Sequence, residues 1–161
     1  MFKLYNNLIL IRHGENIYNT TLDNNKLPLS KKGISQAKNA SKILANKYDI
    51  VISSTSLRTI MTSKIIDNGN MPIEDERLLE RGWGNKQHDG KETDEEAKIR
   101  FKKFLTETVK KYRNKKILLV THGSLMKLAQ DVIEGEVKPR ETIDNCTIIE
   151  YDKFEGKRVI R

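Results

Sequence analysis

The stretch LILIRHGENIYN, residues 8–19, opens with four consecutive apolar residues and then turns abruptly polar. An uninterrupted apolar run is typical of a strand buried on both faces, so we predict a β-strand over residues 8–12. His13 and Gly14 follow at once, where such a strand would end. A second stretch, ILLVTHGS at residues 117–124, repeats this arrangement much later in the chain. The sequence therefore places a His-Gly pair after each of two predicted buried strands.

A helix is predicted to follow the loop after the first strand. Ser30 suits the N-cap position, because its hydroxyl can accept from the unpaired backbone N–H groups of the first turn. The apolar residues behind it recur at roughly helical spacing, and we expect them on one buried side: Ile34, Ala37, Ile43 and Leu44.

Strands and helices continue to alternate along the chain. Short apolar runs predict strands over Asp49–Ser53, Lys116–Thr121, Thr142–Tyr151 and Arg158–Ile160. Helical spacing predicts one helix that ends near Asp67, a long one from about Glu92 to Tyr112, and one from Ser124 to about Glu134. This alternation indicates a mostly parallel central sheet with helices on both faces, which is a three-layer α/β/α sandwich.

The apolar residues of the chain suffice for one hydrophobic core. The clearest apolar stripe lies on the long helix, at spacings of three and four: Ala97, Phe101, Phe104, Leu105, Val109 and Tyr112. With 161 residues, of which 37% are hydrophobic, the chain is long enough for one core and too short for two. We therefore expect a single domain over residues 1–161.

The charge balance favours anionic ligands. Lys and Arg number 30 against 22 Asp and Glu, which gives a formal net charge of +8. A basic surface raises the local concentration of anions. The same charge also fits a general excess of lysine in the composition, so both readings stay open here. The cations are scattered rather than massed in one arm, so nucleic-acid binding is not favoured.

The cysteine content and the amino terminus indicate a cytoplasmic protein. Cys146 is the single cysteine, so no internal disulfide can form, and it has no companion at zinc-ligand spacing. A reducing compartment fits this pattern. The apolar run at residues 8–11 is far shorter than a signal-peptide core or a membrane span. We expect no metal, no cofactor and no membrane partner, and the sequence indicates no oligomeric state.

Three predicted strand ends carry side chains that suit a phosphate group. In an open α/β sheet, ligands gather at the carboxyl ends of the strands, beside loops and helix N-termini. A glycine after each histidine lets the backbone approach a ligand closely. We expect the two imidazoles to face each other across one positively charged cup that is open to solvent. The residues at the three ends are Arg12 and His13, then Ser53 and Ser54 leading to Arg58, then Thr121 and His122.

This setting predicts phosphohistidine chemistry. The guanidiniums of Arg12 and Arg58 disfavour a protonated imidazole, so we expect a lowered pKa and a neutral, nucleophilic His13. Guanidiniums also match phosphate oxygens bidentately and stabilise the charge of a transferring phosphoryl group. His122 can donate to the same oxygens. No metal is required for this chemistry.

The motifs at these positions resemble the histidine phosphatase superfamily, the phosphoglycerate-mutase-like proteins whose signature is Arg-His-Gly. The resemblance implies a phosphoglycerate-mutase-like fold, with His13 as the phosphorylated nucleophile and Arg12, Asn19 and Arg58 as phosphate ligands. It also implies His122 as the second histidine, with the Gly123 N–H as a further donor. The matching segments cover nearly the whole chain: RHGENIYN at 12–19, LPLSKKGISQA at 27–37, SSTSLRTIMT at 53–62, VTHGS at 120–124 and DNCTIIEY at 144–151.

The resemblance also supplies a proton donor. Transfer of a phosphoryl group to histidine needs a proton for the leaving oxygen, and the later hydrolysis needs a carboxylate that activates water. LLERGWGNKQ at residues 78–87 resembles the Leu-x-Glu-Arg segment of the mutases, which gives this role to Glu80 and puts Arg81 beside it as a substrate ligand. The competing carboxylates are Asp75, Glu76 and Glu15.

Three functions fit these residues. The first is a metal-independent phosphomonoester hydrolase that acts on a small phosphorylated metabolite or a phosphoprotein. The second is phosphoglycerate mutase-type phosphoryl transfer, which calls for a lid over the site and extra cations. The family's mutases are longer, with an insertion after the acid segment and a C-terminal tail, so here we expect water to reach the site. The third is an inactive module that binds a phosphorylated partner. Because every residue for the chemistry is present, we favour the hydrolase.

Overall fold

The computed structural model describes residues 7–18, 21–82 and 92–161. The strands are β1 (Asn7–Arg12), β2 (Ile50–Ser53), β3 (Ile73–Glu74), β4 (Ile117–Thr121), β5 (Ile148–Asp152) and β6 (Gly156–Ile160). The helices are α1 (Lys31–Leu44), α2 (Leu57–Ile66), α3 (Asp94–Lys111) and α4 (Gly123–Glu134), with short 3-10 helices η2 (Asn24–Lys26) and η3 (Glu76–Leu78). Within these described residues, no helix is both long and apolar enough to cross a membrane.

The sheet has the strand order β3-β2-β4-β1-β5-β6. The first four strands in this order are parallel to one another, whereas β5 runs antiparallel to β1 and β6 antiparallel to β5. In the central pair, Arg12 at the end of β1 lies opposite Thr121 at the end of β4. The two His-Gly pairs therefore leave neighbouring strands at the same edge of the sheet.

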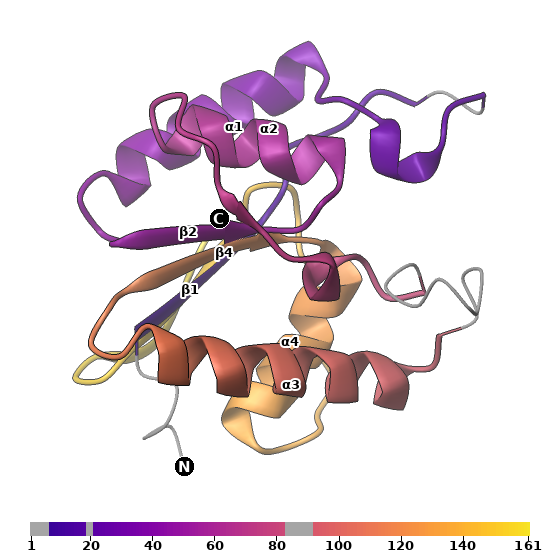
Figure 1. The fold of residues 1–161 in the computed structure, drawn as a ribbon. Coiled ribbons are helices and arrows are strands. Elements are labelled where there is room, and N and C mark those ends of the chain that lie inside the picture. The colour runs from indigo at the N-terminus through magenta and orange to yellow at the C-terminus, as the bar shows by residue number, and fades with distance from the viewer. Residues whose placement is uncertain (1–6, 19–20, 83–91) are drawn as a thin grey trace.

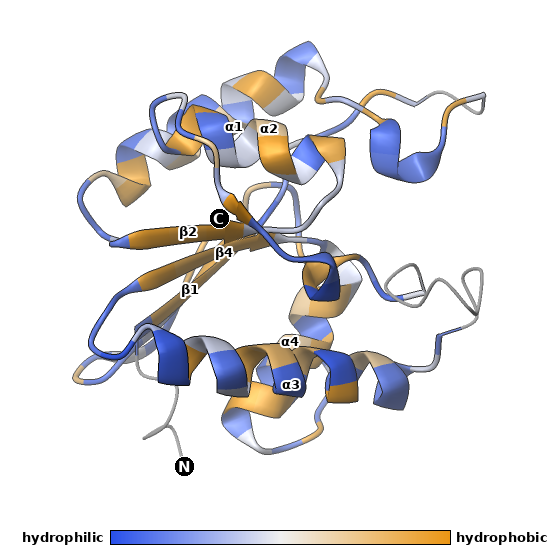
Figure 2. Cartoon of the chain, in the orientation of Figure 1, coloured by the Kyte–Doolittle hydropathy of each residue, from blue (hydrophilic) through white to orange (hydrophobic). Residues whose placement is uncertain are grey.

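Helices cover both faces of the sheet. Figure 1 shows α1 and α2 on one side of the strands and α3 and α4 on the other. Successive residues of β1 point to opposite faces. Leu8 and Leu10 pack with apolar residues of α3 and α4, and Ile9 and Ile11 pack with those of α1 and α2. The labelled strands β1, β2 and β4 are accordingly hydrophobic in Figure 2. The predicted three-layer α/β/α sandwich with a mostly parallel sheet is confirmed.

The predicted cap and apolar stripes are largely found. Ser30 is the N-cap of α1, and its hydroxyl accepts from the N–H of Gly33 at 3.0 Å. Ile43 is 37% exposed, so its predicted place on the buried side of α1 is wrong. The residue that faces the sheet is Ala40, which lies at helical spacing from the neighbouring core positions. On α3, four residues of the predicted stripe are buried: Ala97, Phe101, Phe104 and Leu105.

The segment before the last hairpin differs from the prediction. β5 begins at Ile148, whereas the apolar pattern predicts a strand from Thr142. Cys146 donates its backbone N–H to the Arg12 carbonyl at 3.0 Å and has a φ of 57°, in the left-handed region. The pairing with β1 therefore ends at Arg12, whose N–H donates to the Thr147 carbonyl at 3.3 Å, and the chain before it does not continue as a strand. The two-residue strand β3 is absent from the prediction, because two residues are too few to form a pattern.

Candidate active site

The two histidine loops meet at the carboxyl edge of the sheet. The rings of His13 and His122 have centroids 5.2 Å apart and an interplanar angle of 66°. Their backbones are joined as well, because the His13 N–H donates to the Thr121 carbonyl at 3.0 Å. The parallel pairing of β1 with β4 thus brings together two imidazoles that are far apart in the sequence.

The His13 ring is held so that one nitrogen faces the site. Its Nδ1 lies 2.7 Å from the carbonyl oxygen of Gly14. Because a carbonyl can only accept, Nδ1 carries the proton of the neutral ring and Nε2 keeps its lone pair. The Nε–H of Arg58 donates to that Nε2 at 3.2 Å. Nε2 is therefore the nitrogen whose lone pair this loop presents to the site.

Burial keeps the His13 imidazole neutral. The residue is 4% exposed, and its pKa is lowered from 6.5 to about 3. Burial is the largest cause, the hydrogen bond to the Gly14 carbonyl opposes it, and the guanidiniums of Arg58 and Arg12 lower the pKa further. The direction agrees with the prediction. Desolvation, however, has a larger effect than the two guanidiniums on which the prediction rests.

His122 lies deeper and presents its other nitrogen. The residue is fully buried and forms the N-cap of α4. Arg58 Nη2 lies 3.3 Å from its Nδ1, and a guanidinium can only donate, so Nδ1 is the acceptor. The proton of the neutral ring then sits on Nε2, 3.0 Å from the hydroxyl oxygen of Ser54. Burial first, and then His13 and the nearby guanidiniums, hold the pKa of His122 well below its ordinary value.

One expectation for the cup needs correction. The rings were expected to open to solvent, yet His13 is 4% exposed and His122 is not exposed at all. The physical reason is that the guanidinium of Arg58, a residue that is itself buried, contacts both rings. His122 was expected to donate to phosphate oxygens; in this structure its Nδ1 accepts from Arg58, and the donor role stays a prediction. A bound phosphate would have to take over the donors of Arg58.

Arg58 reaches the site from the first turn of α2, directly after β2. Besides its contacts with the two imidazoles, its Nη1 donates to the Asn24 carbonyl of η2 at 2.6 Å. Burial lowers the pKa of this guanidinium, the charge of Glu80 raises it, and the charge of Arg12 lowers it. The third strand end thus supplies a cation to the same place as the two histidines.

The Arg12 guanidinium has an unused donor. Its Nη1 donates to the Ile143 carbonyl at 2.5 Å. The side chain packs on Gly123, where an added Cβ would lie 3.3 Å from Arg12 Nε. That Nε is buried and has no hydrogen-bond partner among the described residues. A buried donor without a partner costs free energy, so this N–H is available to an acceptor that enters the site.

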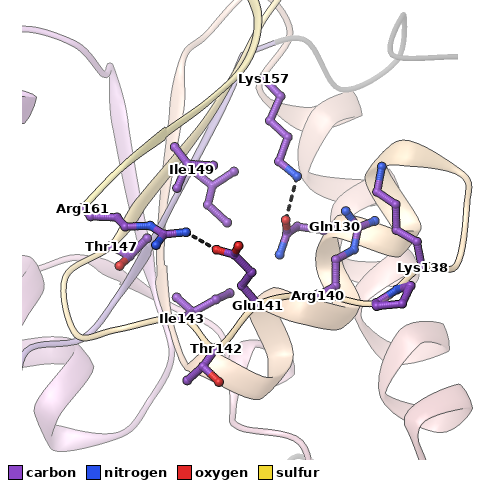
Figure 3. Close-up of a pocket in the computed structure, with 12 residues that line it drawn as sticks. Gln130, Lys138, Arg140, Glu141, Thr142, Ile143, Thr147, Ile149, Lys157 and Arg161 are labelled. Carbon is purple, nitrogen blue, oxygen red and sulfur yellow. Dashed lines mark hydrogen bonds and ion pairs between the residues drawn. The ribbon is translucent and has the colours of Figure 1, made fainter.

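In another pocket, by contrast, the cationic side chains are bound to neighbouring side chains. It has a volume of about 250 Å³ and lies between the final hairpin and the loop after α4. Figure 3 shows its Lys157 bound to Gln130 and its Arg161 bound to Glu141. The other two cations that line it, Lys138 and Arg140, are both paired with Glu134.

Gly14 is required by close packing. A Cβ at this position would lie 2.5 Å from the carbonyl oxygen of Gly33, in the first turn of α1. The Gly14 N–H donates to the hydroxyl of Thr62 in α2 at 3.1 Å. The sequence predicts that glycine allows the backbone to approach a ligand, whereas the structure shows that α1 itself approaches. Gly14 therefore lets both helices of one layer sit against the end of β1.

Glu80 lies beside His122 at the N-terminus of α4. Its Oε1 accepts from the Leu125 N–H at 2.8 Å, and its Oε2 accepts from the Ser124 N–H at 3.1 Å. Unpaired N–H groups and the helix dipole stabilise a negative charge at this position. The charge of Glu80 also raises the pKa of Arg58, so the two groups are near enough to interact.

The competing carboxylates are engaged elsewhere. Asp75 binds the guanidinium of Arg77, with Nη2 at 2.7 Å from Oδ2 and Nε at 3.0 Å from Oδ1. Glu15 accepts from the hydroxyl of the N-cap serine of α1 at 2.7 Å. Glu76 is an exposed residue of η3. In the described part of the chain, no three His, Cys, Asp or Glu side chains gather as a metal site requires.

The remaining predicted ligands are placed in different ways. Gly123 begins α4 and packs against the Arg12 guanidinium. Arg81 is exposed, and its Nε lies 3.4 Å from Oδ1 of Asp94 at the start of α3. Asn19 lies outside the described residues. The substrate-binding roles of Asn19, Arg81 and Gly123 stay predictions.

Sequence reasoning missed Asn145 and Thr62, which hold the site from behind, and it named Ser54 at a strand end without its contact to His122. Asn145 donates from Nδ2 to the His13 carbonyl at 3.0 Å, across 131 intervening residues of the chain. Thr62 binds the N–H of Gly14, and Ser54 contacts the ring of His122. Their signal in the sequence is no more than a polar side chain near the end of an element.

A family model matches almost the whole of this chain. It describes the histidine phosphatase superfamily, branch 1, and matches residues 8–97 and 85–161. A curated relative, the 2,3-bisphosphoglycerate-dependent phosphoglycerate mutase 2 of Lactobacillus johnsonii, is 46% identical over 68 residues. That match covers 37% of this chain and 29% of the mutase, so this chain matches less than a third of that relative's length.

Solved structures share the fold along nearly the full chain. A mycobacterial glucosyl-3-phosphoglycerate phosphatase is similar with a TM-score of 0.73 and 20% identity, covering 95% of each chain. YhfR from Bacillus stearothermophilus is similar with a TM-score of 0.71 and 25% identity, covering 94% of each chain. The arrangement of strands and helices is therefore common to this chain and to both proteins.

Proposed function

Because this chain belongs to the histidine phosphatase superfamily, branch 1, we propose that it is a metal-independent phosphomonoester hydrolase that forms a phosphohistidine on His13. One observation carries the proposal. The guanidinium of Arg58 donates to the lone pair of His13 Nε2 and also contacts Nδ1 of His122. A cation held between two neutral imidazoles supports the proposal that a phosphoryl group binds here and is attacked by His13.

In the first step, the phosphoryl group of the substrate replaces the imidazole acceptors around Arg58. Arg58 and the unpaired Nε–H of Arg12 donate to its oxygens and stabilise their charge. His13 Nε2 attacks phosphorus, and the bond from phosphorus to the leaving oxygen breaks. Glu80, in its protonated form, gives its proton to that leaving oxygen.

In the second step, the same groups hydrolyse the phosphohistidine. The Glu80 carboxylate takes a proton from a water molecule, the water oxygen attacks phosphorus, and the bond from phosphorus to Nε2 breaks. Phosphate leaves, and Glu80 is protonated again. Throughout, the Gly14 carbonyl keeps its hydrogen bond to the Nδ1–H of His13, which stabilises the positive charge of the phosphorylated ring.

The substrate is proposed to be a small phosphorylated metabolite or a phosphoprotein. Nucleic acid and membranes are not proposed as partners, and a cytoplasmic location and a single domain stay predictions of the sequence. Two guanidiniums and the N-terminus of α4 supply positive charge around the site, which supports transfer without a metal. The additional ligands in this proposal are Asn19, Arg81 and Gly123.

A second candidate is mutase-type phosphoryl transfer. The 46% identity with the Lactobacillus johnsonii mutase, over 68 residues, favours this candidate. A mutase returns the phosphoryl group from histidine to a second position of the substrate, so it depends on a bisphosphate primer. Interconversion of phosphoglycerates that requires this primer would identify the mutase, and phosphate release without it would identify the hydrolase.

The proposal is tested with a panel of phosphomonoesters, phosphopeptides and phosphohistidine. Phosphate release is measured for the wild type and for His13→Ala, with and without EDTA. We expect turnover that disappears in His13→Ala, that EDTA leaves unchanged, and a trapped phosphoryl label that is lost in acid and stable in base. A label stable to acid and lost in base would place the phosphoryl group on another residue type. Phosphate binding without any turnover would identify an inactive binding module.

A further inference from the structure

A buried ion pair lies behind the segment that carries Glu80. Arg100 of α3 and Glu92, just before that helix, have side chains that are 10% and 2% exposed. Two contacts join them: Arg100 Nε donates to one carboxylate oxygen at 2.7 Å, and Nη2 donates to the other at 2.8 Å. Burying two charges is expensive unless the remaining donors and acceptors are satisfied as well. The other hydrogen bonds of Arg100 and Glu92 therefore show which part of the chain the pair holds.

The remaining donors of Arg100 all point at one short segment. Nη1 donates to the carbonyl of Arg77 at 2.6 Å and to that of Leu79 at 2.9 Å. Nη2 lies 3.4 Å from the carbonyl of Glu80, so all five N–H groups of the guanidinium are directed at a partner. Glu92 completes the set, because its carboxylate accepts from the N–H of Gly82 at 3.0 Å. The pair thus binds the backbone on both sides of Glu80.

Other backbone contacts lie at the start of this segment, where the Leu79 N–H donates to the Glu76 carbonyl at 3.1 Å and the Leu78 carbonyl accepts from the Thr121 hydroxyl at 2.6 Å. Residues 79–82 lie between η3 and the described start of α3 and belong to no helix or strand. Buried side chains of Leu78 and Leu79 anchor its beginning, but Glu80 itself is only half-buried. The carboxylate of Glu80 reaches forward to α4, while the ion pair holds the backbone behind it against α3.

We propose that Arg100 and Glu92 are positioning residues for the acid Glu80, setting where its carboxyl group stands relative to the leaving oxygen. This inference rests on the role given to Glu80 under the proposed function. Proton transfer depends steeply on distance and direction, so a small shift of the segment slows the step that needs the proton. A purely structural ion pair would instead affect all substrates alike.

The test separates these two cases by the leaving group. A p-nitrophenyl phosphate has an acidic leaving group that departs with little help, whereas an alkyl phosphate needs a full proton from the acid. The rate of phosphoenzyme formation in a single turnover is measured with both esters. The variants are Glu80→Gln, Arg100→Lys and Glu92→Gln. The matched control is Glu150→Gln, a buried glutamate of β5 that is paired with Lys116 and Arg158.

We expect Arg100→Lys and Glu92→Gln to slow the alkyl ester about 10- to 100-fold and the aryl ester only about 3-fold or less. Glu150→Gln should change both rates equally. Combined with Glu80→Gln, Arg100→Lys should add no further selectivity, because both act on one proton transfer. Glu92→Gln keeps the question testable should Arg100→Lys fail to fold.

Two results would overturn the inference, and they are distinguishable. Equal slowing of both esters by Arg100→Lys and Glu92→Gln, with Glu80→Gln still selective for the alkyl ester, would reduce the pair to a structural contact. A Glu80→Gln enzyme without any selectivity would show instead that Glu80 is not the acid. In that second case the proposed mechanism fails at Glu80 itself.

Discussion

At the end of β1 a backbone carbonyl binds His13 through Nδ1, whereas at the end of β4 a serine hydroxyl binds His122 through Nε2. Each loop follows a buried strand, and each carries a His-Gly pair. The result is that one ring offers Nε2 to Arg58 and the other offers Nδ1. The same two-residue pattern thus presents opposite imidazole nitrogens to one cation.

The chemistry of the two partners explains what this difference achieves. A carbonyl oxygen only accepts, so Gly14 fixes the proton of His13 on Nδ1 in every state of the reaction. A hydroxyl accepts or donates by rotation, so Ser54 allows the proton of His122 to sit on either nitrogen. A fixed lone pair suits a nucleophile. An exchangeable proton suits a ligand that accepts from Arg58 in the free site and donates to phosphate in the occupied one.

The largest expected effect comes from removing each ring in turn. His13→Ala removes the nucleophile and should lower kcat by about 10⁴-fold or more, whereas His122→Ala removes one phosphate ligand and should cost about 10²- to 10³-fold. Steady-state phosphate release measures both. Only the His122 variant should still form a phosphoenzyme. Losses of equal size, with no phosphoenzyme in either variant, would contradict the unequal roles.

The second prediction concerns the property that the two rings share. Both have a pKa below that of an unfolded histidine, so between about pH 4.5 and 6.5 the unfolded chain binds more protons than the folded one. The free energy of unfolding should therefore fall as the pH falls through this range, by up to about 1.4 kcal/mol per pH unit for each ring. Denaturant titrations at a series of pH values measure the slope.

The controls for this slope are two single variants, each of which removes one ring. His13→Gln and His122→Gln should each remove about one ring's share of the pH dependence, although they also change the stability at neutral pH. Carboxylates with a lowered pKa, such as Glu134 at about 2, add a slope of the same sign at the acid end of this range, so the difference between wild type and each variant, and not the total slope, gives each ring's share. An unchanged slope in both variants would show that the rings are not buried in the neutral form.

The sequence predicts that the two histidines meet at one edge of the sheet. It does not predict which ring nitrogen each of them presents. Uninterrupted apolar runs predict β1 and β4, and the alternation of elements predicts a parallel sheet that brings His13 and His122 to one edge. Local sequence carries this information, because each run of residues determines its own burial. Which nitrogen each ring presents depends on Gly14 for His13 and on Ser54 for His122. Ser54 lies 68 positions from His122 in the sequence.

The same limit applies to the residues that support the site. The backbone position of His13 depends on Asn145, and that of Glu80 depends on Arg100. Neither residue has a local pattern that distinguishes it from a solvated polar side chain. The positive φ of Cys146 likewise ends the apolar pattern that predicts a strand from residue 142. Contacts of long sequence separation, rather than propensities, decide these details.

The third prediction tests the two glycines. A Cβ at Gly14 would meet the Gly33 carbonyl at 2.5 Å, and the backbone must move to relieve this clash. A Cβ at Gly123 would meet Nε of Arg12 at 3.3 Å, and that side chain can give way. Gly14→Ala should therefore lower the free energy of unfolding by about 1–3 kcal/mol. Gly123→Ala should change it by less than about 1 kcal/mol, since alanine also favours the helix.

Urea denaturation of both variants measures this difference in stability. Activity assays add a second comparison, in which Gly123→Ala is the variant of interest. Gly123→Ala pushes on the guanidinium that we assign to phosphate, so its KM should rise while its stability hardly changes. A Gly14→Ala protein as stable as the wild type would show that α1 does not rest on the β1 loop as closely as this packing indicates.

The smallest effect is expected at the hydroxyl that holds His122. Ser54→Ala leaves the Nε2–H of His122 without its 3.0 Å partner, and the hydroxyl of Ser56, at 3.5 Å, replaces it only in part. We expect kcat to fall about 10-fold, the worth of one buried hydrogen bond, and Ser54→Thr to restore most of it. Ser53→Ala is the matched control, because its hydroxyl binds the Ser54 carbonyl and not the ring. If Ser54→Ala and Ser53→Ala lose the same activity, the hydroxyl has no special role. The contrast between the two strand ends would then rest on burial alone.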